Sequence, residues 1–392
     1  MSDLSQKKKS PPTESIGAAA TLGAQVQPSS KRVRIWACIG AAVLALQLYV
    51  WFRWVTGPYF VRIEPGPTPV PTAMKTVLTV WTAGIVLIFP IAIYWFIVRP
   101  WIRERRITLD GMLVGAMGLM FFQDPLLNFF NTWCTYNTWM WNRGAWTSHI
   151  PGWFSPEEPG KQVSEPLLMN APGYAVGVLL CTIVGCAVMR KVKARWPGIS
   201  NLGLIGVIFV YAIFFDVVME GLLLRIGLYV YPGSIQSLTI FAGHYYQYPL
   251  YEALMWGGAQ AAFCCLRYFT DDRGRTVVER GLDNVKGGVV KQQFIRFLSI
   301  FGAVSAIFFC FYNIPVQFFA MHADAWPADV QERSYFTSNI CGEGSEGPDG
   351  KPVPCPDPSM PMPSKWSGYV NFDGEFVPRE GTELPHMVPL EK

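Results

Sequence analysis

Four carboxylate residues lie in stretches of sequence that are otherwise apolar enough to cross a membrane. They are Asp124, Asp216, Glu220 and Glu252. An ionisable side chain costs at least about 2.5 kcal/mol inside a bilayer, so each such residue is a candidate for function. Asp216 and Glu220 are four residues apart, which places them on one helix face, and Asp124 and Asn128 share this spacing. The pattern predicts an acidic site assembled from several helices.

Two neighbouring carboxyls in a medium of low dielectric constant do not ionise together, because burial and like charge both disfavour the second anion. Such a pair holds a general acid and a general base at once. This suits reactions that lose water through a cation, which aromatic faces also stabilise. We therefore expect Asp124, Asp216, Glu220 and Glu252 to be catalytic. The residues expected to bind substrate are Asn128, Tyr136, Asn137, Asn142, Trp146, His244, Tyr251 and Asn313.

Structural roles are the alternative for each of these polar residues. Glu220 could form an ion pair with Arg225, and Asn313 could hydrogen-bond a neighbouring helix, as polar residues in membrane proteins often do. His244 and Glu252 lie two helical turns apart only if the helix that contains Glu252 begins early. The shared depth of the whole set is the feature that favours a functional site over separate structural roles.

The composition is that of an integral membrane protein. Of the 392 residues, 51% are hydrophobic and only 15% are charged, whereas soluble domains carry about 25% charge. A transmembrane helix needs about 20 mostly apolar residues. We therefore predict an all-α, polytopic membrane helix bundle with about seven transmembrane helices. The predicted spans are 35–56, 76–98, 111–131, 171–189, 201–224, 249–266 and 297–319.

Lysine and arginine mark the side on which each loop lies, because cytoplasmic loops carry an excess of both. The basic residues gather in the N-terminal tail and in the loops after spans two, four and six, whereas the alternate loops are poorer in them. We therefore expect a multi-pass protein of the cell membrane with its N-terminus in the cytoplasm and its C-terminus outside. With this orientation the four carboxylates all fall in the outer half of the membrane.

The regions outside the spans have distinct compositions. Residues 1–34 indicate a disordered, basic cytoplasmic tail, and 320–392 a Pro/Gly-rich extracytoplasmic tail. The seven-helix domain, 35–319, includes a Trp-rich outer segment, 132–170, which we interpret either as a lid over the acidic site or as an interfacial aromatic belt. Cys341 and Cys355 lie in the outer tail, and they are either a disulfide or two free thiols.

Several other classes of membrane protein are excluded. The spans contain no lysine for a retinal Schiff base, and four histidines are too few for an enzyme built on multiple histidine boxes. No glycine-rich phosphate loop and no serine nucleophile elbow are present. The basic residues form separate clusters, which argues against nucleic acid as a partner. We expect no cofactor and no metal, and the expected partners are the bilayer and a lipophilic small-molecule substrate.

A set of short polar and aromatic elements follows from the third predicted span onward: Gln123-Asp124-Pro125, Asn128, Tyr136-Asn137, Asn142-Arg143-Gly144-Ala145-Trp146, Ile150-Pro151-Gly152-Trp153 and Glu165-Pro166. In these elements the sequence resembles the AveC-like spirocyclase family of actinobacterial membrane proteins, over roughly residues 111–317. The resemblance implies a cyclase that needs no cofactor and that closes a dihydroxyketone polyketide into a spiroketal or dehydrates it. Asp124 and Asn128 correspond to motif positions of the family.

Two other functions fit the same pattern. Carboxylates at one depth also suit a carrier or a proton-coupled permease for a lipophilic solute. A non-catalytic membrane partner of a biosynthetic complex would use the tail that begins at Ala320 for docking. The absence of an internal repeat counts against a transporter with two-fold symmetry.

Overall fold

The computed structural model describes residues 30–153, 163–346, 350–358, 368–370 and 376–378. Most of the predicted cytoplasmic tail, the middle of the Trp-rich outer segment and most of the chain after residue 358 lie outside the described residues. The described chain is predominantly helical. Five of its helical rods are long and apolar enough to cross a membrane: Lys31–Thr56, Thr72–Glu104, Leu167–Arg195, Asn201–Arg225 and Val289–Ala320.

The prediction of about seven spans is not confirmed. The third predicted span corresponds to α4 (Leu109–Met120), which continues as a 3-10 helix, η2 (Phe121–Asn128). Pro125 lacks an N–H group for the α-helical ladder and disfavours the α conformation at Asp124, which favours the change to a 3-10 helix here. The sixth predicted span is α8 (Leu250–Tyr268), whose polar residues Glu252, Gln260 and Arg267 interrupt its apolar character. Both helices are largely buried inside the bundle.

Three of the long rods contain a π-helical turn beside a proline. Pro90, Pro172 and Pro315 each lie within a few residues of one of these turns. A proline inside a helix has no backbone N–H donor, and its ring clashes with a carbonyl group of the preceding turn. A π-turn nearby can accommodate this local distortion. The rods are α2 (Thr72–Ile93), η1 (Tyr94–Val98) and α3 (Arg99–Glu104); α5 (Leu167–Gly173), η4 (Tyr174–Val178) and α6 (Leu179–Arg195); and α9 (Val289–Phe308), η7 (Phe309–Asn313) and α10 (Ile314–Ala320).

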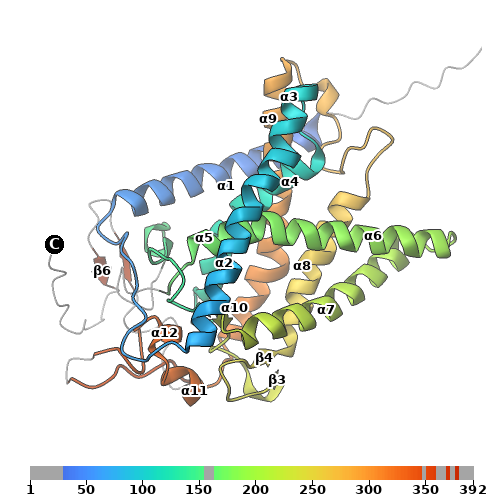
Figure 1. Cartoon of the computed structure of the whole chain (residues 1–392). Helices are drawn as coiled ribbons and strands as arrows, with labels where there is room; N and C mark the ends of the chain where they lie inside the picture. The colour runs from blue at the N-terminus through green and yellow to red at the C-terminus, as the bar shows by residue number, and fades with distance from the viewer. Residues whose placement is uncertain (1–29, 154–162, 347–349, 359–367, 371–375, 379–392) are drawn as a thin grey trace, which may run out of the picture.

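Figure 1 shows α1 (Lys31–Thr56) crossing α9 at one side of the bundle, with α7 (Asn201–Arg225) and α8 toward the other side. Glycine allows the crossing of α1 and α9, as small residues do between membrane helices. A Cβ atom on Gly40 would lie 2.0 Å from the carbonyl oxygen of Leu298, and one on Gly302 would lie 2.4 Å from that of Trp36. The two backbones therefore touch, and no larger side chain fits between them.

Short elements and loops form a cap at one end of the bundle, at the lower left in Figure 1. Its three strand pairs are antiparallel, and residues 57–71 pack against α12 in this cap. The cap elements are β1 (Thr135–Tyr136), η3 (Thr147–His149), β2 (Tyr229–Val230), η5 (Gln236–Leu238), β3 (Thr239–Ile240), β4 (Tyr248–Pro249), α11 (Ala328–Gln331), α12 (Ser334–Thr337), β5 (Gly368–Val370) and β6 (Phe376–Pro378); a further 3-10 turn, η6 (Leu282–Asn284), lies in the loop before α9.

The beginning of the predicted extended tail is part of this cap. The backbone N–H of Thr68 donates to Ser334 Oγ at 3.0 Å, and Ser334 Oγ donates to the carbonyl of Pro65 at 2.7 Å. Cys341 and Cys355 form a disulfide. Residues 320–346 therefore pack against the helical body instead of extending away from it.

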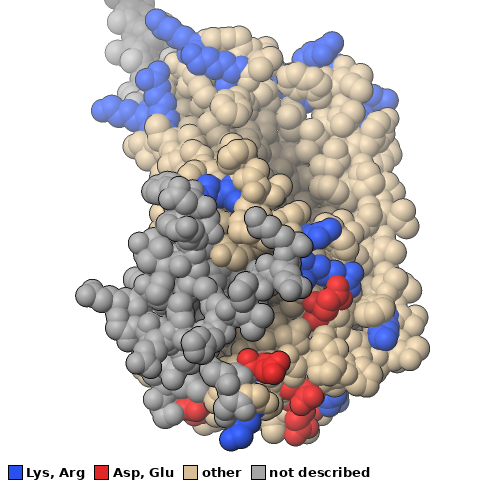
Figure 2. All heavy atoms as spheres, turned by 90° about the vertical axis from the view of Figure 1, so that its left-hand side faces the viewer, with Lys and Arg blue, Asp and Glu red and all other residues tan. Residues whose placement is uncertain are grey.

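The outer faces of the long helices are apolar. Leu87 on α2, Phe214 on α7 and Val290 on α9 are each about 70% exposed, as expected of side chains that face lipid. Figure 2 shows lysine and arginine without visible acidic residues along the top edge of the molecule, where α3 and the beginning of α9 lie, whereas the lower half carries both basic and acidic residues. These faces support insertion of the bundle in a membrane.

Candidate functional site

A cavity of about 210 Å³ lies between the helices at the level of the predicted acidic residues. Asp124, Asp216 and Glu220 line it together, although they come from η2 and α7. Glu252, from the first turn of α8, lies directly behind two of the tyrosines that line the cavity. We call this space the acidic cavity. Its polar wall consists of Asp124, Cys134, Tyr136, Asn170, Tyr174, Cys181, Asp216, Glu220, Tyr229, Tyr231, Trp256 and Tyr312.

Asp124 is the most extensively hydrogen-bonded of the four predicted carboxylates. Tyr136 donates to Asp124 Oδ2 at 2.7 Å, Asn170 Nδ2 donates to the same oxygen at 3.3 Å, and Tyr174 donates to Oδ1. Asn170 also donates to Glu165 Oε2 at 3.2 Å. Asp124 thus has partners for both oxygens while it is only 4% exposed.

Glu165 is a fifth carboxyl group that the sequence analysis did not place in the site. It lies in the loop before α5, is fully buried, and is in hydrogen-bonding contact with Asp124. Burial raises the pKa of Glu165 well above its usual range, and the negative charge of Asp124 raises it further. Burial and the charge of Asp124 thus favour the protonated form of Glu165, which donates a hydrogen bond to Asp124.

A second group of carboxylates is linked by tyrosines. Glu220 accepts from Tyr229 and, at 2.9 Å, from Tyr231. The Tyr231 hydroxyl also lies 3.4 Å from Glu252 Oε1, which accepts from Tyr312 at 2.7 Å. Glu220 and Glu252 are therefore joined through one shared hydroxyl. Asp216, one turn before Glu220, accepts from Tyr248 at 2.7 Å.

Local secondary structure explains how these tyrosines reach the carboxylates. Tyr174 and Tyr312 both lie in π-turns, which often occur at functional sites because they redirect side chains. Tyr136 and Tyr229 are register partners in the β1–β2 ladder. Burial raises the pKa of both Tyr136 and Tyr229 well above the usual range, so both hydroxyls remain donors.

Among the described residues that line the acidic cavity, none is lysine, arginine or histidine. The carboxylates are therefore compensated by hydroxyl and amide donors and by protons rather than by cations. Such a cavity can protonate a ligand and stabilise a positive charge on it. It disfavours ligands that bring a negative charge.

Several predicted binding residues have structural roles instead of lining the acidic cavity. Asn128 Oδ1 accepts from the N–H groups of Trp133 and Cys134. Asn137 Nδ2 donates to the carbonyl of Gly227. Asn142 binds both the N–H and the carbonyl of Ile63, so it fixes the loop 57–71. These amides hold the segments that carry the tyrosines in place.

Three further predicted binding residues, His244, Tyr251 and Asn313, also lie away from the acidic cavity. The α8 helix begins at Leu250, so His244 and Glu252 do not share a helix face; His244 is exposed and stacks on Tyr246 at 4.9 Å. Tyr251 accepts from the N–H of Ile235. Asn313 donates to Gln123 Oε1 at 3.5 Å between two helices, which matches the structural alternative. Of the eight predicted binding residues, Tyr136 is the one that lines the cavity.

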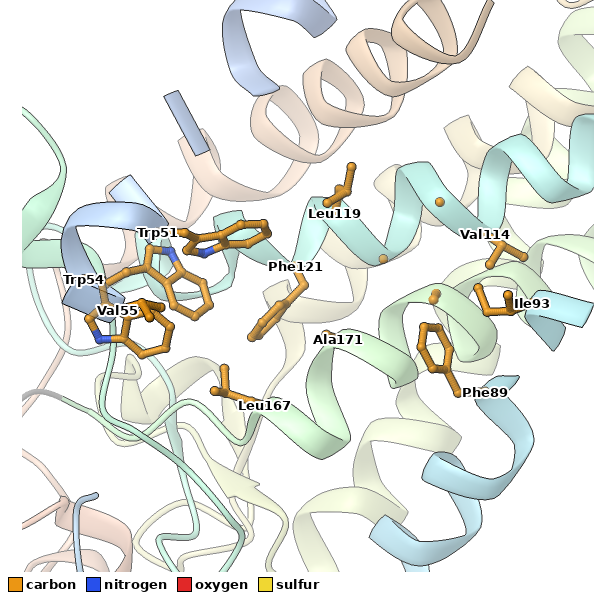
Figure 3. A pocket seen from close by; sticks show the side chains of 14 residues that line it. Trp51, Trp54, Val55, Phe89, Ile93, Val114, Leu119, Phe121, Leu167 and Ala171 are labelled. Atoms are coloured by element: carbon orange, nitrogen blue, oxygen red, sulfur yellow. The ribbon is translucent and has the colours of Figure 1, made fainter. Parts of the chain in front are cut away.

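Trp146 borders a second space, which we call the apolar pocket. Its volume is about 550 Å³, and its described walls come from α1, α2, α4, η2 and α5. Figure 3 shows Trp51 and Trp54 of α1 at one end and Phe89 and Ile93 of α2 at the other. Trp146 Nε1 donates to the carbonyl of Phe122, so its ring is held in this wall. The pocket lacks polar side chains apart from the tryptophan rings, so it offers no chemistry of its own.

The residues missed by the sequence analysis are mainly donors to the carboxylates. They carry weak local signals, since a tyrosine beside an aromatic belt is indistinguishable from an interfacial anchor. Glu165 does have a signal, because it belongs to the Glu165-Pro166 element of the family resemblance. The missed residues are Glu165, Asn170, Tyr174, Tyr229, Tyr231, Tyr248, Trp256 and Tyr312.

The helical bundle and its apolar outer faces are typical of a membrane-inserted protein, and its acidic cavity is lined by carboxyl groups. The chain belongs to the AveC-like spirocyclase family: the family model described as "Spirocyclase AveC-like" matches residues 104–336. This match confirms the resemblance and includes every carboxylate of the acidic cavity. Neither the curated proteins nor the solved structures contain a match to this chain.

Proposed function

We propose that this protein is a membrane-embedded cyclase or dehydratase that acts on a lipophilic, polyketide- or lipid-like substrate without a cofactor. Membership of the spirocyclase family and the apolar helices support a membrane-associated cyclase-like role. The observation that carries the proposal is that Asp124, Asp216 and Glu220 line one buried cavity whose described walls hold no cation.

The proposed reaction converts a dihydroxyketone into a cyclic ketal with loss of one water. One substrate hydroxyl adds to the ketone and forms a hemiketal. Glu165 gives its proton to Asp124, and Asp124 passes a proton to the hemiketal hydroxyl, which leaves as water. The departure of water leaves an oxocarbenium ion, which the remaining carboxylates stabilise by their negative charge.

The second ring closes when the other substrate hydroxyl attacks the oxocarbenium carbon. Glu220 or Asp216 accepts the proton released by this hydroxyl, since both line the cavity on the α7 side. Loss of a neighbouring C–H proton to the same base gives an enol ether, which is the dehydrated product. The tyrosine hydroxyls fix the carboxylate orientations, and the low access of water prevents capture of the cation.

The test is to incubate membranes that contain the protein with lipid extracts and to compare product masses. We expect a product lighter than its precursor by one water. Asp124→Asn and Glu220→Gln should abolish this product and leave expression intact, because amides keep the shape but cannot exchange the proton. Asp283→Asn, at an exposed ion pair outside the cavity, is the matched control and should retain activity. Full turnover in both cavity variants would refute the proposal.

Proton-coupled transport is the second candidate. The chain of hydrogen bonds from Glu220 through Tyr231 and Glu252 to Tyr312 favours it, because linked carboxyls and hydroxyls can relay a proton. A flux assay in proteoliposomes separates the two functions. Accumulation of a solute with unchanged mass indicates transport, whereas loss of one water indicates the enzyme.

The proposed orientation places the N-terminus in the cytoplasm and the cap outside. The basic top edge in Figure 2 supports it, since cytoplasmic loops are rich in lysine and arginine. The disulfide between Cys341 and Cys355 in the cap is also typical of an oxidising compartment. A protease added outside intact cells should cleave the cap region and leave the loops near α3 uncut.

A further inference from the structure

We propose that the acidic cavity opens sideways into the bilayer between α2, α6 and α7, and that a neutral, hydroxylated chain lipid enters through this opening. The inference rests on the proposed function, for which it supplies the route and the class of substrate. We call the feature the lateral opening. Its rim consists of Trp81 and Ile85 on α2, Gly177 and Cys181 on the α6 rod, and Phe215 and Met219 on α7.

The exposure of the rim residues shows that the cavity reaches the outer surface here. Trp81 lines the cavity and is also 37% exposed, and Gly177, Cys181 and Met219 are half-buried. By contrast, Asp216 and Asn170, deeper in the same cavity, are each 2% exposed. The cavity is therefore buried around Asp124, Asp216 and Asn170 and accessible at its apolar end.

The surface next to the rim faces lipid on all three helices. Val80 on α2 is 66% exposed, Leu180 on α6 is 50% exposed, and Phe214 and Val218 on α7 are 71% and 48% exposed. About half or more of each of these large apolar side chains is uncovered by protein. A molecule that approaches the lateral opening therefore comes from the hydrocarbon of the bilayer and not from water.

The depth of the opening follows from the positions of two cations. Lys75 on α2 lies over the ring of Trp139, and Arg225 at the end of α7 lies over that of Tyr246. Such pairs mark the membrane interface. The rim residues on both helices are six to ten positions further along, which at 1.5 Å per residue places them about 9–15 Å below that level. The opening thus lies in one half of a hydrocarbon core about 30 Å thick.

The two helices that flank the opening meet above it. A Cβ atom on Gly227, just after α7, would lie 2.5 Å from Met74 Cε on α2, so the helix ends are in contact there. Asn137 Nδ2 also donates to the sulfur of Met74 at 3.1 Å. The cap therefore closes the cavity on the side of Lys75, and the membrane side remains as the route for a substrate.

The chemistry of the walls selects the class of ligand. The rim is apolar and fits a hydrocarbon chain, whereas the deep end presents carboxyls and hydroxyls that bind substrate hydroxyl or carbonyl groups. Because the described walls hold no lysine, arginine or histidine, a carboxylate or phosphate would be repelled. The structure thus favours a neutral polyol or hydroxyketone chain over a fatty acid or a phospholipid.

Gly177 provides a direct way to close the opening. No atom lies within 4 Å of the position where its Cβ would be, so a side chain there projects into free space at the rim. We predict that Gly177→Trp fills the lateral opening. Gly206 on α7 is also open within 4 Å, but it is exposed and does not line the cavity, so Gly206→Trp is the matched control.

The experiment uses the full chain in liposomes and a long-chain 1,2-diol that carries a diazirine in its alkyl chain. After irradiation, mass spectrometry maps the labelled peptides. In the wild type and in Gly206→Trp we expect labelling of 174–181 and 215–223, which an excess of unlabelled diol suppresses. In Gly177→Trp we expect this labelling to be lost. A fatty acid with the same chain and diazirine should leave both peptides unlabelled.

Three outcomes would overturn the inference. They are undiminished labelling in Gly177→Trp, labelling in the wild type that unlabelled diol does not suppress, and equal labelling by the fatty acid. The competition by unlabelled diol is measured in the wild type, so it tests the lateral opening even if Gly177→Trp fails to fold. Specific labelling without any loss of water from a substrate would leave the lateral opening in place and refute the proposed enzyme alone.

Discussion

Tyr136 and Tyr229 face each other across the β1–β2 ladder, with ring centroids 5.6 Å apart, and each donates to a carboxylate of a different group. Tyr136 donates to Asp124, and Tyr229 donates to Glu220. A ladder of two residue pairs thus holds the two halves of the acidic cavity in register. Both strands lie in loops outside the long helices, so the cap positions the site even though it supplies none of the four predicted carboxylates.

Removal of either hydroxyl should reduce activity without unfolding the protein. We expect Tyr136→Phe and Tyr229→Phe each to lower turnover about 10- to 100-fold, because a hydrogen bond to a charged group contributes about 1.5–3 kcal/mol. The measurement is the rate of water loss from the substrate in membranes. Tyr94→Phe, at an exposed position on the α2 rod, is the control and should have wild-type rates. Unchanged rates in both cavity variants would show that the ladder is only structural.

Glu165 should make the protein less stable as pH rises. Its pKa is raised from an ordinary 4.5 by burial, so the folded protein binds its proton more tightly than the unfolded chain does. The unfolded chain releases this proton above about pH 4.5, and stability therefore declines with increasing pH until the folded protein has also lost it. We expect Glu165→Gln to weaken the decline in melting temperature between pH 5 and pH 8.

The exposed Glu64 provides the control for this measurement, since its side chain is 68% exposed. Glu64→Gln should leave the pH dependence of the melting temperature as it is in the wild type. If the melting temperature of Glu165→Gln declined with pH as steeply as those of the wild type and Glu64→Gln, Glu165 would not be the group that titrates.

The carboxylates were predictable from the sequence because their position in apolar stretches is itself unusual. Asp124, Asp216 and Glu220 line one cavity as their depth and spacing indicated. The asparagines could not be assigned in the same way, because an amide that binds substrate and one that satisfies a turn look identical in sequence. Asn142, which binds the backbone of Ile63 79 residues away, depends on a long-range contact that no local pattern contains.

The number of spans was the weaker part of the prediction, for a physical reason. Hydropathy reports how apolar a segment is, but not whether lipid or protein surrounds it. The α4 helix has the hydropathy of a span, yet Met112, Leu113 and Met117 are almost completely buried by other helices. The Asp124-Pro125 step then ends the α-helix after 12 residues. Pro90, Pro172 and Pro315 do not end their rods, so a proline within an apolar run does not by itself predict a shorter element.

The crossing of α1 and α9 predicts opposite effects for two glycine substitutions. Gly40→Ala should destabilise the protein by about 1–3 kcal/mol, because the new methyl group would lie 2.0 Å from the carbonyl oxygen of Leu298. Gly206→Ala meets no atom within 4 Å and should stabilise it slightly, by about 0.4–1 kcal/mol, through helix propensity and a less flexible unfolded chain. Thermal unfolding of both variants in the same detergent checks the two effects. Equal melting temperatures of Gly40→Ala and Gly206→Ala would contradict the close contact between α1 and α9.

His149 should loosen the cap on acidification. Burial and, to a smaller extent, the nearby charge of Arg53 lower the pKa of His149 from 6.5 to about 4. The neutral ring is therefore the folded form, and the stability associated with it is complete above pH 6.5 and is lost as pH falls toward 4. We expect faster amide exchange at 149–150 at pH 5 than at pH 7, after correction for intrinsic rates, and little such change in His149→Phe. His322→Gln, at an exposed histidine, should respond as the wild type does, and pH-independent protection in the wild type would refute the assignment.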